Sequence, residues 1–295
     1  VSRYNNRLCY TRELRYSNLW YVNLLDARTT TSYQPKQLTT GTLANFSPNF
    51  SPDGQKIAFS TAKGEHANIF VMPIAGGQMQ QLTYMDAYNA NPVWSPDGDE
   101  IAFASWQDQS IKVWKIKADG RQLRTFDDTK LSYDFELTWS PGPDILYQIP
   151  GKRNFQKLNP LTQQGTPLVE NESVGWITSP SYSPDGKSVA IYRADQWDAS
   201  QSGLWLISVQ NSSQKLLMRN LYNVIPITWS TDSQWICAIS NEKTPHELLK
   251  IPTNGGKGKT IFTLPVDEID GLTITPDGKH LVYAAVEKKS DIWFM

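Results

Sequence analysis

Side chains that commonly carry catalysis or bind metals are few in this sequence, and they are widely separated. The three histidines are His66, His246 and His280, and no two of them have the spacing of a metal-binding pair. The Gly-x-Ser-x-Gly turn that presents the nucleophile of many serine hydrolases does not occur. The sequence therefore predicts a protein that is not an enzyme, with no catalytic residue, no metal and no cofactor.

Aspartates do recur in a fixed setting, the motif aromatic-Ser-Pro-Asp-Gly. Full copies span 50–54, 94–98 and 182–186, and weaker copies begin at Trp139, Trp229 and Ile274. Regularly placed carboxylates could bind calcium, but a tight turn explains them more simply. In such a turn Pro presets its own φ, Asp bonds to nearby backbone, and Gly adopts a positive φ without strain. We therefore interpret these aspartates as structural.

The motif repeats with the period of a propeller blade. The first residues of successive copies are 44, 45, 43, 47 and 45 positions apart. A period of roughly 40–45 residues is typical of a four-stranded β-propeller blade. Each copy ends a first strand. A second strand such as 57–60, a third such as 68–72 and a closing Gln-Leu-Thr such as 81–83 follow it.

Aligning Val1 with Trp94 adds a further unit at the N-terminus, with strands at 8–10 and 19–22. The last unit then stops in its third strand, near 292–295. The sequence thus predicts an all-β fold, a seven-bladed β-propeller of four-stranded antiparallel blades. A six-bladed ring is the alternative. It ranks second because it would leave surplus second and third strands unpaired.

The turn motif, the Ile-Ala-Phe strands at 57–59 and 101–103, and the closing Gln-Leu-Thr resemble the repeat of TolB-type propellers, over essentially the whole chain. This resemblance implies a partner-binding protein. Segments 7–20 and 235–256 also resemble the C-terminal propeller of bacterial membrane-anchored winged-helix regulators of the ToxR/CadC type. That second resemblance implies the periplasmic sensor domain of a transcriptional regulator, which serves signal transduction.

The chain ends, the net charge and the apolar stretches indicate what kind of protein this sequence belongs to and which partners it lacks. The chain begins with Val1 and ends with the apolar run 292–295, so we expect residues 1–295 to be a single propeller domain cut from a longer protein. The net charge of −1 gives no electrostatic footprint for nucleic acid. No apolar stretch approaches the ~20 residues of a membrane span, so any membrane contact would come through flanking segments.

The two cysteines, Cys9 and Cys237, fall on the repeat position of Ala102, in the second strand of the first and sixth units. One blade would lie between them in a seven-bladed ring. Their Cα atoms could then not approach the roughly 4.4–6.8 Å that a disulfide needs. We expect two small buried residues with free thiols, which fits either a periplasmic or a cytoplasmic location.

A binding end is indicated by the loops that precede first strands and by those between second and third strands, which emerge together in a propeller. The former carry ten acids against two bases, Lys130 and Arg219. Aromatic residues on such variable loops are typical of recognition surfaces, although they could instead plug the channel or cap the blades. The predicted binding residues are Tyr88, Trp106, Tyr133, Asp134, Trp176, Trp197, Tyr222, Asp267 and Asp270.

Three functions are compatible with this pattern. The preferred hypothesis is a sensor that binds a basic peptide, a protein or a cationic small ligand at the acidic, aromatic end. The second is a propeller hydrolase or lyase, although three dispersed histidines cannot build the His-rich metal site of the oligogalacturonate lyases. The third is the regulatory propeller of a prolyl-oligopeptidase-like hydrolase. Flanking sequence would distinguish the first hypothesis from the third.

Overall fold

The computed structural model describes residues 9–29, 33–107, 110–125, 136–148, 155–159, 165–168, 176–195, 197–219, 228–240 and 245–294. Strands make up nearly all of their regular structure, with one short α-helix, α1 (Leu24–Thr29), and one 3-10 turn, η1 (Ala199–Gln201). No helix among these residues has the length and apolar character that crossing a membrane would require.

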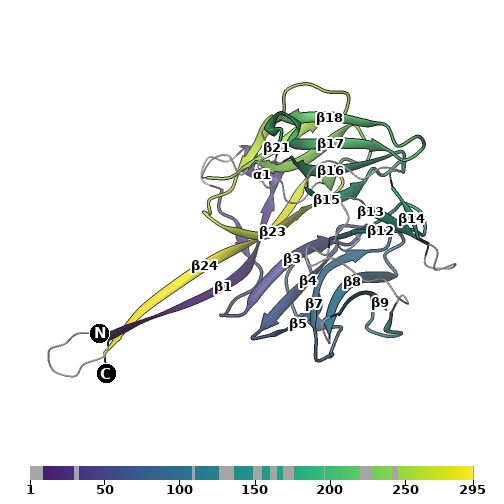
Figure 1. The fold of residues 1–295 in the computed structure, drawn as a ribbon. Coiled ribbons are helices and arrows are strands. Elements are labelled where there is room, and N and C mark those ends of the chain that lie inside the picture. Colours follow the sequence, from purple (N-terminus) through teal and green to yellow (C-terminus); the bar gives the residue numbers. More distant parts are fainter. Residues whose placement is uncertain are drawn as a thin grey trace.

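The described strands fall into six antiparallel groups of four, and each group is one blade (Figure 1). Blade 1 is β23 (Ile269–Ile274), β24 (His280–Phe294), β1 (Cys9–Asn23) and β2 (Lys36–Gln37). Blade 2 is β3 (Ala44–Phe50), β4 (Lys56–Lys63), β5 (His66–Pro73) and β6 (Gln80–Gln81). Blade 3 is β7 (Tyr88–Trp94), β8 (Glu100–Gln107), β9 (Ser110–Lys117) and β10 (Arg124–Thr125).

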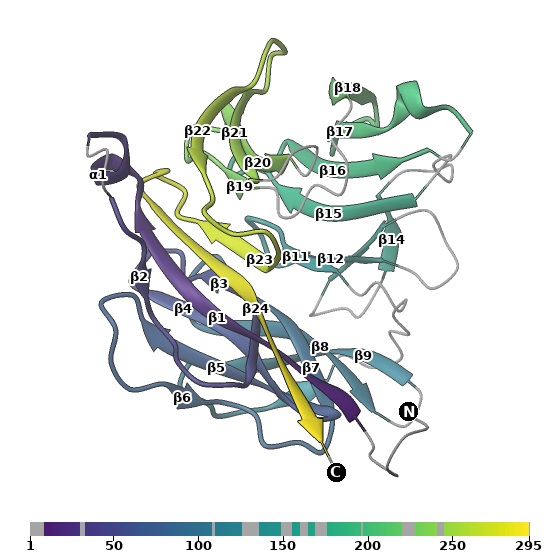
Figure 2. The same ribbon diagram turned by 90° about the vertical axis from the view of Figure 1, so that its left-hand side faces the viewer.

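The other three blades have the same order. Blade 4 is β11 (Leu137–Trp139), β12 (Ile145–Gln148), β13 (Phe155–Leu158) and β14 (Gly165–Pro167). Blade 5 is β15 (Trp176–Tyr182), β16 (Ser188–Ala194), β17 (Gly203–Ser208) and β18 (Gln214–Arg219). Blade 6 is β19 (Thr228–Trp229), β20 (Trp235–Ser240), β21 (Glu247–Pro252) and β22 (Lys259–Thr263). Figure 2 shows the blades arranged around a common axis.

Buried apolar clusters show that the blades close into a ring. Each of the six contacts between neighbouring blades holds its own cluster. Between blades 1 and 2, for example, Leu19 of β1 shares a cluster with Phe59 of β4. Leu248 of β21 and Tyr283 of β24 share the cluster that joins blade 6 back to blade 1. The core is therefore a set of inter-blade layers and not one central core.

The expected seven blades are not confirmed, because the two chain ends build one blade together. All 15 residues of β1 pair with the 15 residues of β24, from Cys9 opposite Phe294 to Asn23 opposite His280. The described residues of the strands expected at 8–10 and 19–22, which are 9–10 and 19–22, therefore belong to one continuous strand. Residues 292–294 of the strand expected near 292–295 continue β24 in the same way. No surplus strand is left among the described residues, which removes the objection to six blades.

The Ser-Pro-Asp-Gly turns have the structural role expected for their aspartates. The Ser95 hydroxyl donates to the Asp97 carboxylate at 2.6 Å, and the backbone N–H of Asp99 donates to the same oxygen at 3.0 Å. The Ser95 oxygen in turn accepts from the backbone N–H of Glu100 at 2.9 Å. Equivalent side-chain pairs close four other turns: Ser51–Asp53, Ser183–Asp185, Ser230–Asp232 and Thr275–Asp277.

Polar contacts link two of the first strands to the blade before them. Trp94 and Trp229 each end a first strand, both are buried, and the indole N–H of each donates to a carbonyl of the preceding blade. Trp94 donates to the Asn49 carbonyl at 3.1 Å, and Trp229 donates to the Ser181 carbonyl at 3.0 Å. These contacts set the packing of neighbouring first strands, which line the axis.

The two cysteines do not occupy the equivalent repeat positions that the sequence predicts. Cys9 begins β1, at the far end of its pairing with β24, and so does not lie in the second strand of a blade. Cys237 lies in β20, in the second strand of blade 6 as expected. It is partly buried and packs against the cluster between blades 6 and 1.

Candidate functional site

The first strand of four blades carries the same bulge. The ladder register shifts within β3, β7, β15 and β23. At the shift, φ is positive at Ser47 (49°), Asn91 (54°), Ser179 (55°) and Gly271 (118°). Non-glycine residues seldom adopt such angles, and those that do cluster at functional sites. Bulges re-aim side chains, and here the bulged segments line the axis.

A proline follows the bulge residue in three of these strands, in the dipeptides 47–48, 91–92 and 179–180. Proline has no N–H to donate, so it suits a position where the ladder is already interrupted. This Ser/Asn-Pro pair lies shortly before the aromatic residue of each blade and is visible in the sequence. It was not among the predicted site features, because the Ser-Pro-Asp-Gly turn is the more obvious repeat.

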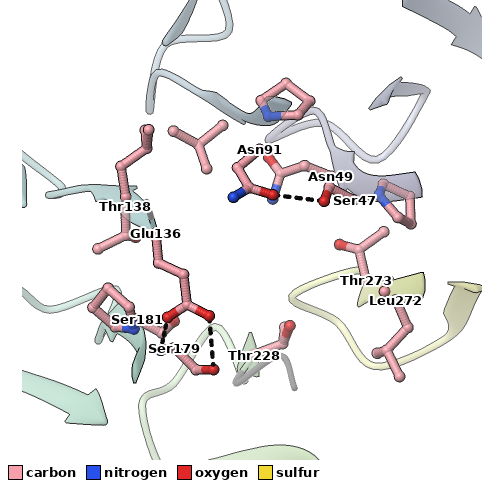
Figure 3. A pocket seen from close by; sticks show the side chains of 16 residues that line it. Ser47, Asn49, Asn91, Glu136, Thr138, Ser179, Ser181, Thr228, Leu272 and Thr273 are labelled. Atoms are coloured by element: carbon pink, nitrogen blue, oxygen red, sulfur yellow. Dashed lines mark hydrogen bonds between the residues drawn. The ribbon is translucent and has the colours of Figure 1, made fainter. Parts of the chain in front are cut away.

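A cavity of about 180 Å³ lies on the axis where the bulges meet (Figure 3). The first strands of all six blades contribute to its wall, through Ser47, Asn91, Leu137, Ser179, Thr228 and Gly271 among others. Because packed sheets hold each of these strands, the cavity is formed before any ligand binds. Hydroxyl and amide groups dominate its labelled lining in Figure 3.

Glu136 supplies the single ionisable side chain among the described residues that line the cavity. Its carboxylate accepts hydrogen bonds from the backbone N–H of Ser179 and, at 3.4 Å, from the Ser179 hydroxyl. Across the cavity the Ser47 hydroxyl donates to the amide oxygen of Asn91 at 2.6 Å. Glu136 is one of the ten acids of the loops that precede first strands, but it was not among the predicted binding residues. Its position directly before a first strand could have singled it out.

Three of the predicted binding residues come together beside this axis. Tyr88 begins β7 and lies directly opposite Trp106 of β8, whose side chain is 44% exposed. The Tyr88 ring stacks on Phe46 of blade 2 with centroids 5.8 Å apart. Burial raises the pKa of the Tyr88 phenol, and the negative charge of Asp270 raises it further. Tyr88, Trp106 and Asp270 therefore form one part of the candidate site.

Burial raises the pKa of Asp270, and the positive charge of Arg15, whose guanidinium lies 3.5 Å from the Asp270 carboxylate, opposes the rise. Arg15 also pairs with Glu268, whose other oxygen lies 2.7 Å from the Lys288 ammonium. A hydrogen bond from Lys288 accordingly lowers the pKa of Glu268. The acid excess expected from the loops is therefore smaller than the sequence suggested, because β1 and β24 bring Arg15 and Lys288 to the same end.

Trp197 lies on a different blade, in the loop between β16 and β17, and its side chain is 80% exposed. The buried residue Asp195 anchors this loop. The Asp195 carboxylate accepts from the backbone N–H groups of Trp197 at 2.9 Å and Asp198 at 3.0 Å, and it pairs with Arg193 at 3.3 Å. The loop thus presents an exposed aromatic ring on an ordered support, which suits contact with another molecule.

Two of the remaining predicted residues lie in the described part of the chain. Trp176 begins β15, opposite Ala194. Asp267 is exposed, and its carbonyl accepts a hydrogen bond from His246 Nε2 at 2.9 Å. Tyr133, Asp134 and Tyr222 lie outside the described residues.

The histidines have separate partners. His66 pairs with Asp86 at 3.1 Å, and His280 shares a hydrogen bond of 2.8 Å with the hydroxyl of Tyr21. Within the described ranges, no group of three or more His, Cys, Asp or Glu side chains could hold a metal ion.

A sequence profile described as the TolB β-propeller domain matches residues 16–166, about half of the chain. The chain belongs to the TolB β-propeller family. TolB-like propellers are protein-interaction domains, which agrees with a preformed axial cavity surrounded by variable loops.

Solved structures support the same fold. A TolB structure from Agrobacterium tumefaciens is similar over 92% of this chain and 99% of its own, with a TM-score of 0.73 and 18% identity. An oligogalacturonate lyase in complex with manganese is similar over 92% of this chain and 78% of its own, with a TM-score of 0.57 and 14% identity. At these identities the likeness extends to the fold alone.

One curated relative matches part of the chain. A Sulfurisphaera tokodaii protein named as a Tricorn-like protease C-terminal subunit is 28% identical over 131 residues, which are 44% of this chain. The match covers 14% of that protein, so the relative is far longer than the shared segment.

Proposed function

We propose that this chain is a non-catalytic binding propeller that takes a partner protein, a peptide or a small ligand at the axial cavity and the loops around it. The observation that carries the proposal is the convergence of all six first strands on one cavity. Ligand sites are usually preformed hollows that combine apolar walls with a few placed polar groups. This cavity has that character, with Leu137 and Gly271 beside Ser47, Asn91 and Glu136.

The ligand group that fits the cavity is a cation with hydrogen-bond donors, such as the guanidinium of an arginine or the ammonium of a lysine. The Glu136 carboxylate supplies the charge, and charge-assisted hydrogen bonds to a carboxylate are stronger than neutral ones. Hydroxyl and amide oxygens around it accept further donors. Tyr88 and Trp106 at the rim provide aromatic surface for the rest of a peptide.

The wider role is the sensory part of a bacterial transcriptional regulator on the periplasmic side of the inner membrane. Its support is the resemblance of segments 7–20 and 235–256 to membrane-anchored regulators. A cytoplasmic location is the alternative. Detection of the native protein in periplasmic or in cytoplasmic fractions decides between the two.

A second candidate function is the regulatory propeller of a larger peptidase, which the Sulfurisphaera relative favours. A third is a lyase, which the fold of the manganese-bound enzyme favours. Turnover of peptide or oligogalacturonate substrates, with and without added manganese, would contradict the non-catalytic proposal. Binding without turnover supports it.

Calorimetric titration with a capped arginine-containing peptide tests the binding proposal directly, with the same peptide carrying neutral citrulline as the matched probe. Wild type should prefer the arginine peptide, and Glu136→Gln should lose that preference because the carboxylate is gone. Glu65→Gln is the control, since Glu65 is an exposed acid in the turn between β4 and β5. Equal affinity for both peptides, or full binding by Glu136→Gln, would overturn the cationic-ligand assignment.

A further inference from the structure

Beyond the propeller body, β1 and β24 continue together as a two-stranded ribbon that projects away from the blades (Figure 1). We propose that the outer edge of β24 in this ribbon pairs with the same edge of a second copy of the chain. The pairing is antiparallel and centred on Ser290. It does not depend on ligand binding at the axis, because the ribbon lies outside the cavity.

The backbone directions identify which groups are offered for pairing. The Val286 N–H donates to the Glu268 carbonyl at 3.0 Å, on the side of β24 that faces away from β1. On the partner strand the Ser17 N–H points away from β24, to the Leu43 carbonyl at 3.3 Å, and Ser17 lies opposite Val286. Because backbone direction alternates along a strand, the backbone N–H and C=O groups of Lys288, Ser290 and Ile292 also point to this outer edge.

That outer edge has no strand beside it in the described structure. The pairing of β23 with β24 runs from Ile274 opposite Leu281 to Ile269 opposite Ala285, and no described strand pairs with the outer edge of β24 beyond that point. An unpaired edge is a template for another strand, and an isolated two-stranded ribbon is marginally stable in water. Addition of a second ribbon would make a four-stranded sheet.

Charge complementarity selects the second copy and its register. Across a two-fold axis, residues whose backbone groups point outward must face residues of the same kind. If the axis passes through Ser290, Lys289 of each copy lies opposite Asp291 of the other, and Lys288 of each copy lies opposite Ile292 of the other. Opposite charges in facing positions stabilise a sheet, and like charges destabilise it. Centring on Lys288, Lys289 or Asp291 instead places each of those residues opposite its own copy, which is a like-charge pair.

The edge lysines could alternatively protect the edge from pairing, as charged residues often do. Lys288 is already paired with Glu268 at 2.7 Å, however, which reduces its repulsion toward a second copy. Lys289 lies over the ring of Tyr16, 5.5 Å from its centroid. An edge contact without a large apolar area is expected to be weak, so the dimer should depend on concentration.

Disulfide trapping tests the register. In a background with Cys9→Ser and Cys237→Ser, Ser290→Cys should form a covalent dimer under mild oxidation, because residues at the axis face each other about 5.5 Å apart. Lys288→Cys is the matched control, since its own copy lies several residues away across the axis. Equal trapping of both variants would overturn the register. Absence of trapping for Ser290→Cys would overturn the edge contact.

Light scattering across a concentration series tests the charge pairing. Asp291→Lys should shift the equilibrium toward monomer, since it places lysines opposite each other. The exchange Lys289→Asp with Asp291→Lys should restore dimer, because opposite charges face each other again. Circular dichroism checks that each variant is folded. Wild type that stays monomeric at every concentration, or an exchange variant that fails to recover, would overturn the proposal.

Discussion

Replacement of Leu19 by alanine tests whether the N-terminal strand is part of the propeller core. Leu19 is fully buried and shares a cluster with Phe59 of blade 2 and Val282 of β24. The substitution removes three buried carbons, worth about 2.4 kcal/mol at about 0.8 kcal/mol each. Sheets hold the neighbours in place, so a cavity of roughly 50 Å³ remains and adds about 1 kcal/mol. The expected loss in unfolding free energy is about 3–4 kcal/mol.

Equilibrium urea unfolding followed by tryptophan fluorescence measures this loss. Leu123→Ala is the matched control, because Leu123 is 39% exposed and belongs to none of the inter-blade clusters. It should change the unfolding free energy by no more than about 0.5 kcal/mol. If Leu19→Ala were as mild as the control, β1 would not be packed between blade 2 and β24. The reasoning about ring closure would then be refuted.

Three further predictions concern a bulge, a turn and the exposed loop. Gly271→Ala should destabilise the fold by about 1–3 kcal/mol, because φ is +118° and the added Cβ would lie 3.2 Å from the backbone of Ser47 in the neighbouring bulge. Gly41→Ala is the control, since Gly41 has a similar φ of +113° but open space around it, and so shows the effect of backbone strain alone. The hydrogen bond from Ser95 holds the pKa of Asp97 below its ordinary value of 3.8. This carboxylate therefore stabilises the fold above that pH, and the stability difference between wild type and Asp97→Ala should shrink as the pH falls through the lowered pKa, which acid unfolding would show. Trp197→Ala should leave the melting temperature unchanged and weaken partner binding, so a melting temperature that falls by several degrees would assign the ring to the fold instead.

The local structure of each blade could be predicted from sequence because its determinants are local. The turn at 94–98 contains its own stabilising groups, since Ser95 and Asp97 bond to each other and to backbone within the same few residues. The apolar run that follows the turn, 101–104, consists of residues that are all buried in β8. The same reasoning correctly assigned a structural role to the turn aspartates.

The blade count could not be predicted in this way because it depends on pairing between the two ends of the chain. Leu8 and Tyr10 fit the repeat as a second strand, and Leu19 fits as a third. Two short strands in one repeat unit and one long strand give the same alternation of side chains with period two, so this alternation does not tell the two cases apart. Only the pairing of Cys9 with Phe294, far apart in sequence, distinguishes them.

The candidate site was predicted in part. Tyr88 and Asp270 were both among the predicted binding residues, and each stands at the beginning of a first strand, where the charge of Asp270 acts on the Tyr88 phenol. The excess of acidic side chains at this end was overestimated, because Arg15 of β1 and Lys288 of β24 reach the same end. Glu136 was not selected because its proximity to Ser179, 43 residues away in sequence, arises from the ring and not from any local pattern.

Disulfide mapping of a cysteine pair at 15 and 288 tests the shared first blade most directly. Arg15 and Lys288 face each other in the ribbon, in a pair whose backbone groups point outward and whose Cα atoms are therefore about 4.5 Å apart. With Cys9 and Cys237 replaced by serine, Arg15→Cys with Lys288→Cys should cross-link within one chain, and Arg15→Cys with Ser290→Cys should not. Absence of the first cross-link in folded protein would contradict a six-bladed ring closed by the two ends of the chain.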